Sequence, residues 1–364
     1  MTGSVNPTGE QFPFVILVVE DNDYMCDVLV GALKRIGFPR TQFVKSVKHA
    51  VEVLSESNKP GSRGGPVVDI VISDMVTPPV NAIHLLRWIR NDKASPNRFL
   101  PLIMLSGAAD RSNVVESRDL GSNLFMAKPF SVEKLFKAVQ RIIDAPRQFV
   151  MTQSYFGPDR RIAAKDSKFP GTEKRRPDEK HATIVYNDAR IEKANQDSKG
   201  GEVWLFKLPN GLKQSLGSSA MRVEFTIPGH IIESAQGELK REGAGFLDWA
   251  KIYLDDISKE IDAAKGAAGG RDAAFAKVNF IAHELRGQGG TFGFPLITAF
   301  AKSLYQVTHP PCRTDDAGAE IVKAHVDTLR AVIREKIGGD GGEVGKQLYL
   351  GLRQAIAKYG APPA

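Results

Sequence analysis

The sequence has few cysteines and lacks a long apolar stretch. Its two cysteines, Cys26 and Cys312, lie far apart and have no metal-type spacing, which argues against a disulfide framework and indicates a reducing compartment. No apolar run approaches the roughly 18 residues needed to span a bilayer. The amino terminus also lacks the basic and apolar regions of a secretory signal. We therefore expect a cytoplasmic protein that does not contact the membrane.

The composition is that of an ordinary globular protein with a basic excess. The chain has 364 residues, of which 42% are hydrophobic and 25% charged, and this length allows two or three domains. Its net charge of +7 would suit nucleic-acid binding only if the basic residues formed a recognition surface. Residues 1–13 carry no periodic pattern, and we expect them to be disordered.

Residues 14–145 alternate between strand and helix patterns. Helical patterns such as Tyr24–Ile36 and Ile83–Arg90 lie between short apolar runs, which are typical of parallel strands buried on both faces. Five strands with five helices predict an α/β fold with a doubly wound, five-stranded parallel sheet, whose functional crevice lies at the carboxyl ends of the strands. The predicted strands are Phe14–Val19, Thr41–Lys45, Val67–Ser73, Leu100–Leu105 and Asn123–Ala127.

Polar side chains follow four of these strands. Glu20 and Asp21 end the first strand, Asp74 the third, Ser106 the fourth and Lys128 the fifth. Three carboxylates gathered at one edge repel each other and need a cation, and oxygen ligands beside a phosphate-bearing substrate suit Mg²⁺. The lysine can offset charge on a phosphoryl group, and the serine hydroxyl can hydrogen-bond one of its oxygens. Asp74 is then a candidate nucleophile that forms an acyl phosphate.

These motifs give residues 14–146 a resemblance to a response regulator receiver domain, which has a flavodoxin-like fold. The resemblance rests on ILVVED, VISDMVTPP, IMLSG and FMAKPF, in the family's order and spacing. It implies a set of roles: Asp74 as the phosphoacceptor, Glu20, Asp21, Asp74 and the backbone carbonyl of Val76 as Mg²⁺ ligands, Lys128 and Ser106 as phosphoryl contacts, and Phe125 as the aromatic residue whose rotamer follows phosphorylation.

The chain departs from the family pattern near the phosphoacceptor. Asn81-Ala82 stands where Asp-Gly is usual, although Asn81 can still cap the following helix. The positions two residues after the acceptor and two after the hydroxyl residue influence acyl phosphate hydrolysis in the family. Here they are Val76 and Ala108, and neither side chain can orient an attacking water. We therefore expect slow self-dephosphorylation, which suits passing the phosphoryl group onward.

The α/β pattern ends at Pro146, and residues 147–242 are expected to form a basic linker with short β-strands. Much of the basic excess lies in Arg147–Lys180, which contains FGPDRR and GTEKRR. A solvated linker is the favoured interpretation, and an anion or nucleic-acid patch is the alternative. DNA binding is not favoured, because no helix-turn-helix, zinc or aromatic stacking pattern accompanies the charge. The strand patterns are Ala182–Tyr186, Glu202–Leu208 and Met221–Ile227, with a hairpin turn signal at Asn210-Gly211.

Residues 243–362 are helical in pattern. Apolar residues recur at helical spacing in five segments joined by short turns, which predicts an all-α antiparallel bundle. Leu254, Ile297 and Leu329 are examples of the apolar faces. His325 falls near one of these faces and is expected to be a buried, hydrogen-bonded residue rather than a reactive one.

A second candidate site lies in the segment NFIAHELRGQGGTFGFP. Ile281 and Leu285 belong to its apolar face, and His283 points about 200° away from Ile281 at 100° per residue, so we expect it to face solvent. Gly287 leaves the imidazole unobstructed, and Arg286 places a permanent cation one turn away. The segment resembles the signature of a histidine phosphotransfer (Hpt) domain, with Arg286 in place of the usual lysine, and the resemblance implies that His283 carries phosphate.

Together the two resemblances predict a two-component phosphorelay protein. Asp74 would take a phosphoryl group from a phosphohistidine with Mg²⁺, and His283 would exchange one with a receiver aspartate. The implied partners are a sensor histidine kinase, other receiver domains, or both. Whether the chain counts as an enzyme stays open, because it has no ATP-binding kinase module and the glycine-rich turn near residue 340 lacks the context of a phosphate-binding loop. The alternative is a phosphorylation-gated module whose bundle docks a partner without carrying phosphate.

Overall fold

The structure is a computed structural model in which the chain separates into two compact units. One unit holds residues 1–105, 110–126 and 133–235, and the other holds residues 236–364 together with the short segments 106–109 and 127–132. Each is described by itself below. The residues that the structure describes are 11–57, 67–77, 80–107, 111–152, 154–159, 183–184, 204–206, 208–217, 224–241, 243–264 and 271–360.

A five-stranded sheet forms the centre of the first unit. The strands are β1 (Ile16–Val19), β2 (Thr41–Val44), β3 (Ile70–Asp74), β4 (Leu102–Ser106) and β5 (Leu124–Ala127). They lie in the order β2-β1-β3-β4-β5, and β1 pairs in parallel with both β2 and β3. The predicted doubly wound parallel sheet is therefore confirmed.

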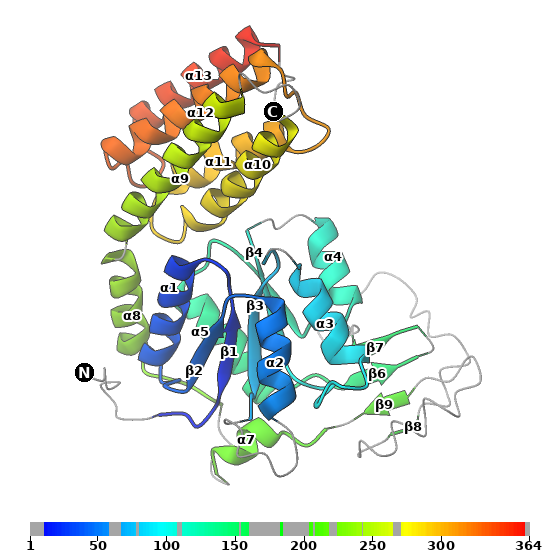
Figure 1. Ribbon diagram of the computed structural model, residues 1–364. Coiled ribbons are helices and arrows are strands. Elements are labelled where there is room, and N and C mark those ends of the chain that lie inside the picture. Colours follow the sequence, from blue (N-terminus) through cyan, green and yellow to red (C-terminus); the bar gives the residue numbers. More distant parts are fainter. Residues whose placement is uncertain are drawn as a thin grey trace, which may run out of the picture. The chain divides into compact units, whose positions relative to one another are not determined.

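Helices cover both faces of this sheet. Helices α2 and α3 lie on one face, and α1 and α5 lie on the other (Figure 1). Alternate strand residues such as Leu17 and Val71 pack with Leu54 of α2 and Leu85 of α3 in one buried cluster. This burial on both faces explains the continuous apolar runs of the strands. The helices are α1 (Asp23–Arg35), α2 (Val47–Ser57), α3 (Ala82–Asn91), α4 (Arg111–Asp119) and α5 (Val132–Asp144).

A second, smaller sheet follows the five-stranded one. Its order is β7-β6-β9-β8, in which β6 is antiparallel to β7 and β9 while β8 is parallel to β9. Three of its phenylalanines form a cluster with Phe99, whose ring centroid lies 5.0 Å from that of Phe149. The strands are β6 (Phe149–Met151), β7 (Phe156–Pro158), β8 (Thr183–Ile184) and β9 (Trp204–Phe206).

The range predicted as a linker, residues 147–242, differs from the sequence prediction in two places. Asn210 was expected to begin a hairpin turn, but its side chain accepts the N–H of Lys213 at 3.0 Å and caps the short helix α7 (Gly211–Ser215). The residues from Glu224 to Ile227 are not a strand, and Gly229–Arg241 forms helix α8 inside the range assigned to the linker.

Aromatic contacts explain part of this difference. Phe225 is buried, with its ring centroid 4.5 Å from that of Phe12 and 5.7 Å from that of Phe136. Phe12 belongs to the range expected to be disordered, yet it is buried and its N–H donates to the carbonyl of Gly37 at 2.8 Å. Residues 1–10 of that range lie outside the described residues, as does the basic stretch from Arg160 to Ala182.

The second unit is helical. Leu254, Leu285 and Leu329 are fully buried, as expected for the apolar faces of packed helices. Within the described part of the chain, no helix is both long and apolar enough to cross a membrane. The helices are α9 (Gly243–Ala264), α10 (Arg271–Gln288), α11 (Pro295–Thr308), α12 (Asp316–Arg334) and α13 (Gly342–Lys358).

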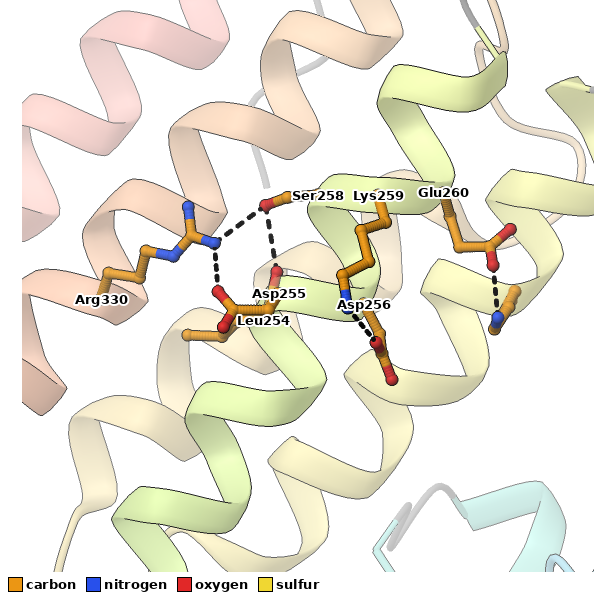
Figure 2. Close-up of polar contacts among 8 residues, drawn as sticks. Leu254, Asp255, Asp256, Ser258, Lys259, Glu260 and Arg330 are labelled. Atoms are coloured by element: carbon orange, nitrogen blue, oxygen red, sulfur yellow. Dashed lines mark hydrogen bonds and ion pairs between the residues drawn. The ribbon is translucent and has the colours of Figure 1, made fainter.

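Polar contacts join α9 to its neighbours on the outside of this unit. Arg330 of α12 donates to Asp255 at 2.6 Å and to Ser258 at 3.1 Å (Figure 2). Lys277 of α10 pairs with Glu260 of α9. These side chains are at least partly exposed, so the contacts fix orientation more than they stabilise the fold. They show which helices α9 packs against.

Candidate functional site

Three carboxylates meet at the carboxyl edge of the five-stranded sheet. Glu20 and Asp21 follow β1 directly, and Asp74 is the last residue of β3. Because β1 and β3 are parallel with Val19 opposite Ser73, the residues that follow both strands reach the same edge. One ligand atom from each of the three carboxylates lies within 4.8 Å of the others. Glu20 and Asp74 are 0% and 1% exposed, so the strand ends hold charge away from bulk water.

Local hydrogen bonds fix the chain that carries these acids. The Glu20 N–H donates to the carbonyl of Val44 at 3.1 Å, and the Asn22 side chain accepts the N–H of Met25 at 3.1 Å as the N-cap of α1. An oxygen of the Asp74 carboxylate accepts the N–H of Met75 at 2.8 Å. Glu20, Asp21 and Asp74 thus lie at a helix start and a strand end, where backbone geometry is well determined.

The thiol of Cys26 lies close to these carboxylates and is affected by their negative charge. Cys26 in α1 is buried, and its Sγ–H donates to the carbonyl of Glu20 at 3.1 Å. Burial raises the pKa of Cys26 to about 12, and the Glu20 carboxylate adds to that rise because it disfavours a thiolate. Cys26 is therefore a neutral, unreactive thiol at neutral pH.

The serine and the lysine predicted for the site follow the next two strands. Ser106 is the last residue of β4 and is fully buried. Lys128 comes directly after β5, is 6% exposed, and donates its backbone N–H to the carbonyl of Ser106 at 2.7 Å. The sheet order β3-β4-β5 puts both residues at the edge where Asp74 lies.

The remaining predicted residues flank this edge. Val76 lies two residues after Asp74 and is partly buried, while Phe125 of β5 packs partly buried against the cluster beneath α2 and α3. Asn81 caps α3 by accepting the N–H of Ile83 at 3.0 Å, as expected from the sequence. Ala108 lies outside the described residues. Sequence reasoning did not single out Thr77, which is buried three residues after Asp74, since a lone threonine carries no distinguishing pattern.

The donor set fits a hard divalent cation. All three candidate ligands are carboxylates, and no thiol or imidazole joins the cluster found among the described residues. Oxygen-only sites with several carboxylates suit Mg²⁺, which retains waters and accepts phosphate oxygens. Without a cation, three close carboxylates in a partly buried site would repel one another strongly. The cluster can therefore hold Mg²⁺.

The second candidate site is on helix α10, and its predicted exposure is wrong. His283 is 7% exposed and Arg286 5%, whereas the sequence analysis placed His283 in solvent. That analysis assumed a single apolar face, but α10 packs against both α9 and α11. The ring of Tyr305 from α11 lies 5.8 Å from that of His283, and the Arg286 guanidinium carbon lies 4.3 Å from the Tyr305 ring centroid.

Gly289, directly after α10, allows α10 and α11 to approach closely. A Cβ on Gly289 would lie 2.8 Å from the backbone nitrogen of Thr298 and 2.9 Å from the carbonyl oxygen of Phe294. The N–H of Gly290 donates to the Thr298 hydroxyl at 2.8 Å. Gly287, the glycine predicted to leave His283 accessible, lies in the last turn of α10. At Gly289 the glycine is required because the two helices approach closely.

His325 contrasts with His283. It is fully buried in α12, with Nδ1 2.8 Å from the carbonyl of Ile321 and Nε2 2.9 Å from the hydroxyl of Ser303. Burial lowers its pKa to about 4, so the ring is neutral at pH 7. Both ring nitrogens have partners within the helical unit, which confirms the expectation of a structural histidine.

Comparison with known proteins assigns residues 16–140. Residues 16–140 match the family described as the response regulator receiver domain. Similar proteins include the chemotaxis protein CheY of Pseudomonas aeruginosa, 26% identical over 129 residues that make up 35% of this chain and 95% of that protein. The chemotaxis protein CheY-3 of Vibrio cholerae is 27% identical over 129 residues, which are 35% of this chain and 91% of that protein.

Two similar solved structures each cover about a third of this chain. One is the receiver domain of a sensor histidine kinase from Pseudomonas aeruginosa, with a magnesium ion in its active-site cleft. It is 26% identical, and the match covers 35% of this chain and 95% of that structure with a TM-score of 0.30. Another is the receiver domain of a histidine kinase from Syntrophus aciditrophicus, 29% identical, covering 35% and 89% with a TM-score of 0.30. From the family match and the observed sheet, residues 16–140 are a receiver domain of two-component signalling.

Proposed function

We propose that this protein is a phosphorelay component in which Asp74 and His283 each carry a phosphoryl group. The observation that carries the first half is the cluster of Glu20, Asp21 and Asp74 at the carboxyl edge of a receiver sheet. The second half rests on the motif around His283, with Arg286 and Gly287 in the same helix. The proposed domains are a receiver at 14–146, a connector at 147–242 and an antiparallel Hpt-like bundle at 243–362.

Asp74 is the proposed nucleophile. One of its carboxylate oxygens attacks the phosphorus of a phosphohistidine, and the P–N bond breaks as the new P–O bond forms. The leaving imidazole nitrogen keeps the electron pair of the broken bond. The transfer is in line, so catalysis depends on positioning and on neutralising charge rather than on a general base. The Asp74–Met75 hydrogen bond holds the carboxylate in place for this attack.

Mg²⁺ would be held by Glu20, Asp21, Asp74 and the carbonyl of Val76. When bound, it supplies positive charge that offsets the charge of the transferring group. Lys128 is proposed to add a second cation, and Ser106 a hydroxyl that hydrogen-bonds a phosphoryl oxygen. Phe125, half-buried beside this edge, is the proposed residue that responds to phosphorylation.

His283 is proposed to exchange its phosphoryl group with a receiver aspartate, either Asp74 of this chain or that of another protein. The imidazole nitrogen attacks the acyl phosphate, whose P–O bond breaks to restore the carboxylate. The Arg286 guanidinium, one turn from His283, would offset phosphoryl charge. This step requires a state in which the α10 face that carries His283 is open to a receiver. The proposed partners are a sensor histidine kinase, other receiver domains, or both.

The test of the first half is labelling with a small phosphodonor such as acetyl phosphate, in the full chain, with and without Mg²⁺. We expect an alkali-labile label that requires Mg²⁺ and is lost in Asp74→Asn. The matched control is Asp27→Asn, an exposed aspartate of α1, which should label as the wild type does. Label that persists in Asp74→Asn would contradict the assignment.

One observation favours a second candidate function. Because His283 is 7% exposed, the helical unit could instead be a docking module whose partner binding changes when the receiver is phosphorylated. In that case the bundle carries no phosphate. Label would stay on Asp74 even when phosphorylated kinases and other receivers are supplied, and partner binding would be lost in Asp74→Asn but kept in His283→Gln.

A further inference from the structure

A cavity lies at the edge of the receiver sheet opposite the carboxylates. Its volume is about 260 Å³. Val68, Pro101 and Asn123, which precede β3, β4 and β5, line one side, and this places the cavity at the amino ends of the strands. The chain that follows the receiver closes the other side, from Pro146 to Phe149 and from Leu208 to Leu212. All of the lining residues belong to the first unit.

The cavity carries an excess of positive charge. Arg141 of α5 and Arg147 both line it. The Nε of Arg147 is buried and donates to no group among the described residues, and a buried donor without an acceptor is costly. Burial and, to a smaller extent, the charge of Arg141 lower the pKa of Arg147. An anion between them would relieve both the repulsion and the missing hydrogen bond.

The acidic groups near the cavity do not supply the hydrogen-bond acceptor that the Nε of Arg147 lacks. Asp69 lines the cavity, but its Oδ2 accepts the N–H of Val15 at 2.8 Å. Asp159 and Tyr155 raise the pKa of Arg147, although their effect is smaller than that of burial and Arg141.

The walls are mainly apolar and aromatic. Phe99 and Phe149 stand edge to face with ring centroids 5.0 Å apart, and both line the cavity beside Leu124. The amide oxygens of Asn97 and Asn210 are already used, since they accept the N–H groups of Phe99 and Lys213 at 3.0 Å each. The arginines are the cationic donors of the lining, and much of the rest of the wall offers apolar contact.

We propose that this cavity binds a small aromatic carboxylate, with its carboxylate between Arg141 and Arg147 and its ring against Phe99 and Phe149. Its volume lies just below the range of roughly 300–1,000 Å³ for drug-sized ligands, which favours a single ring. Arginine pairs with carboxylates through two parallel hydrogen bonds, and the ring contributes apolar burial. The ligand joins the receiver to the segment that follows it, because both form the walls.

The test is calorimetric titration of the full chain with benzoate, and with benzyl alcohol as a neutral probe of similar shape. We expect saturable benzoate binding, and binding of benzyl alcohol at least tenfold weaker. Arg147→Gln should weaken benzoate at least tenfold, whereas Arg87→Gln, which changes an exposed arginine of α3, should leave it unchanged. Acetyl phosphate labelling of Arg147→Gln at the wild-type level would show that the receiver remains folded.

Three outcomes would overturn the proposal: absence of saturable binding up to millimolar benzoate, equal binding of benzoate and benzyl alcohol, or equal losses in Arg147→Gln and Arg87→Gln. A filling variant, Leu208→Trp, provides a second measurement. It should abolish benzoate binding while phosphodonor labelling continues, and unchanged binding in this variant would place the carboxylate elsewhere. The result is independent of the phosphorelay proposal, since the cavity lies at the opposite edge of the sheet from Asp74.

Discussion

The two edges of the receiver sheet bury charge in opposite ways. At the carboxyl edge, Glu20, Asp21 and Asp74 gather like charges within 4.8 Å. At the amino edge, the fully buried guanidinium of Arg90 is surrounded by neutral oxygens: its nitrogens donate to the carbonyls of Gly121, Arg98 and Leu100 and to the side-chain oxygen of Asn123, at 2.7–2.9 Å.

The difference distinguishes a structural charge from a functional one. Burial lowers the pKa of Arg90 to about 9, which still leaves it charged at pH 7, and its hydrogen bonds offset the cost of that burial. The three carboxylates instead bring like charges together, and like charges at this distance repel one another. A bound cation would offset that repulsion, which makes the carboxyl edge a candidate binding site and the Arg90 network part of the scaffold.

The largest expected effect is the loss of stability when the buried Arg90 is replaced. Arg90→Met should lower the free energy of unfolding by about 3–5 kcal/mol, because it leaves several buried oxygens without a donor. Urea denaturation followed by circular dichroism would measure it. Arg87→Met, at an exposed position of the same helix, should change the value by less than about 0.5 kcal/mol. Equal effects of the two variants would show that the buried Arg90 network stabilises the fold no more than an exposed arginine does.

The helical unit also buries a titratable side chain, that of His325. The pKa of His325 falls from 6.5 to about 4 in the folded state, so unfolding takes up a proton at intermediate pH. Its stabilising contribution is present above pH 6.5 and is lost as the pH falls towards 4, by about 3 kcal/mol in all. Urea unfolding across this range should show a shallower loss in His325→Gln than in wild type, whereas His230→Gln, an exposed control in α8, should follow wild type.

A smaller effect tests the acidic edge. Asp21→Asn should weaken Mg²⁺ binding at least tenfold, since one of three anionic ligands becomes neutral. Without Mg²⁺ the same variant should be no less stable than wild type, because one repulsive charge is gone. Calorimetric Mg²⁺ titration and urea denaturation measure the two quantities, with Asp27→Asn as the control. A variant that loses stability without Mg²⁺ but keeps Mg²⁺ affinity would make Asp21 a scaffold residue.

The smallest effect concerns exposed charge. Arg330→Ala removes the contacts with Asp255 and Ser258 on the outside of the helical unit (Figure 2). We expect a loss of only about 0.2–1 kcal/mol in unfolding free energy, which high salt should reduce further, because solvent screens the pair. A loss as large as that of Arg90→Met would show that exposure does not separate the two classes of charge.

Much of the receiver site could be predicted from the sequence, because parallel strands must be apolar and only their ends can be polar. Glu20, Asp74 and Lys128 stand out for that reason, and Asn81 is recognisable as a cap from its side chain alone. The α8 helix and the capping role of Asn210 were missed. The structure around them depends on contacts between residues far apart in sequence, such as Phe225 against Phe12. A local sequence pattern does not reveal such contacts.

The exposure of His283 was mispredicted for a related reason. A helical wheel shows which side of α10 is apolar, but it does not show how many helices pack on it. Both α9 and α11 do, and Tyr305 of α11 lies against the imidazole. Because His283 is little exposed, its ability to take up phosphate decides between phosphotransfer and docking as the role of the helical unit.

The central claim is therefore tested most directly by following label after acetyl phosphate has phosphorylated the full chain, alone and with a separate phosphorylated receiver domain. The account predicts acid-labile, alkali-stable label in wild type and in His230→Gln, and none in His283→Gln. Loss of that label in Asp74→Asn without an added receiver would make Asp74 the internal donor. Label that stays alkali-labile under every condition would contradict phosphotransfer by His283 and leave the helical unit as a docking module.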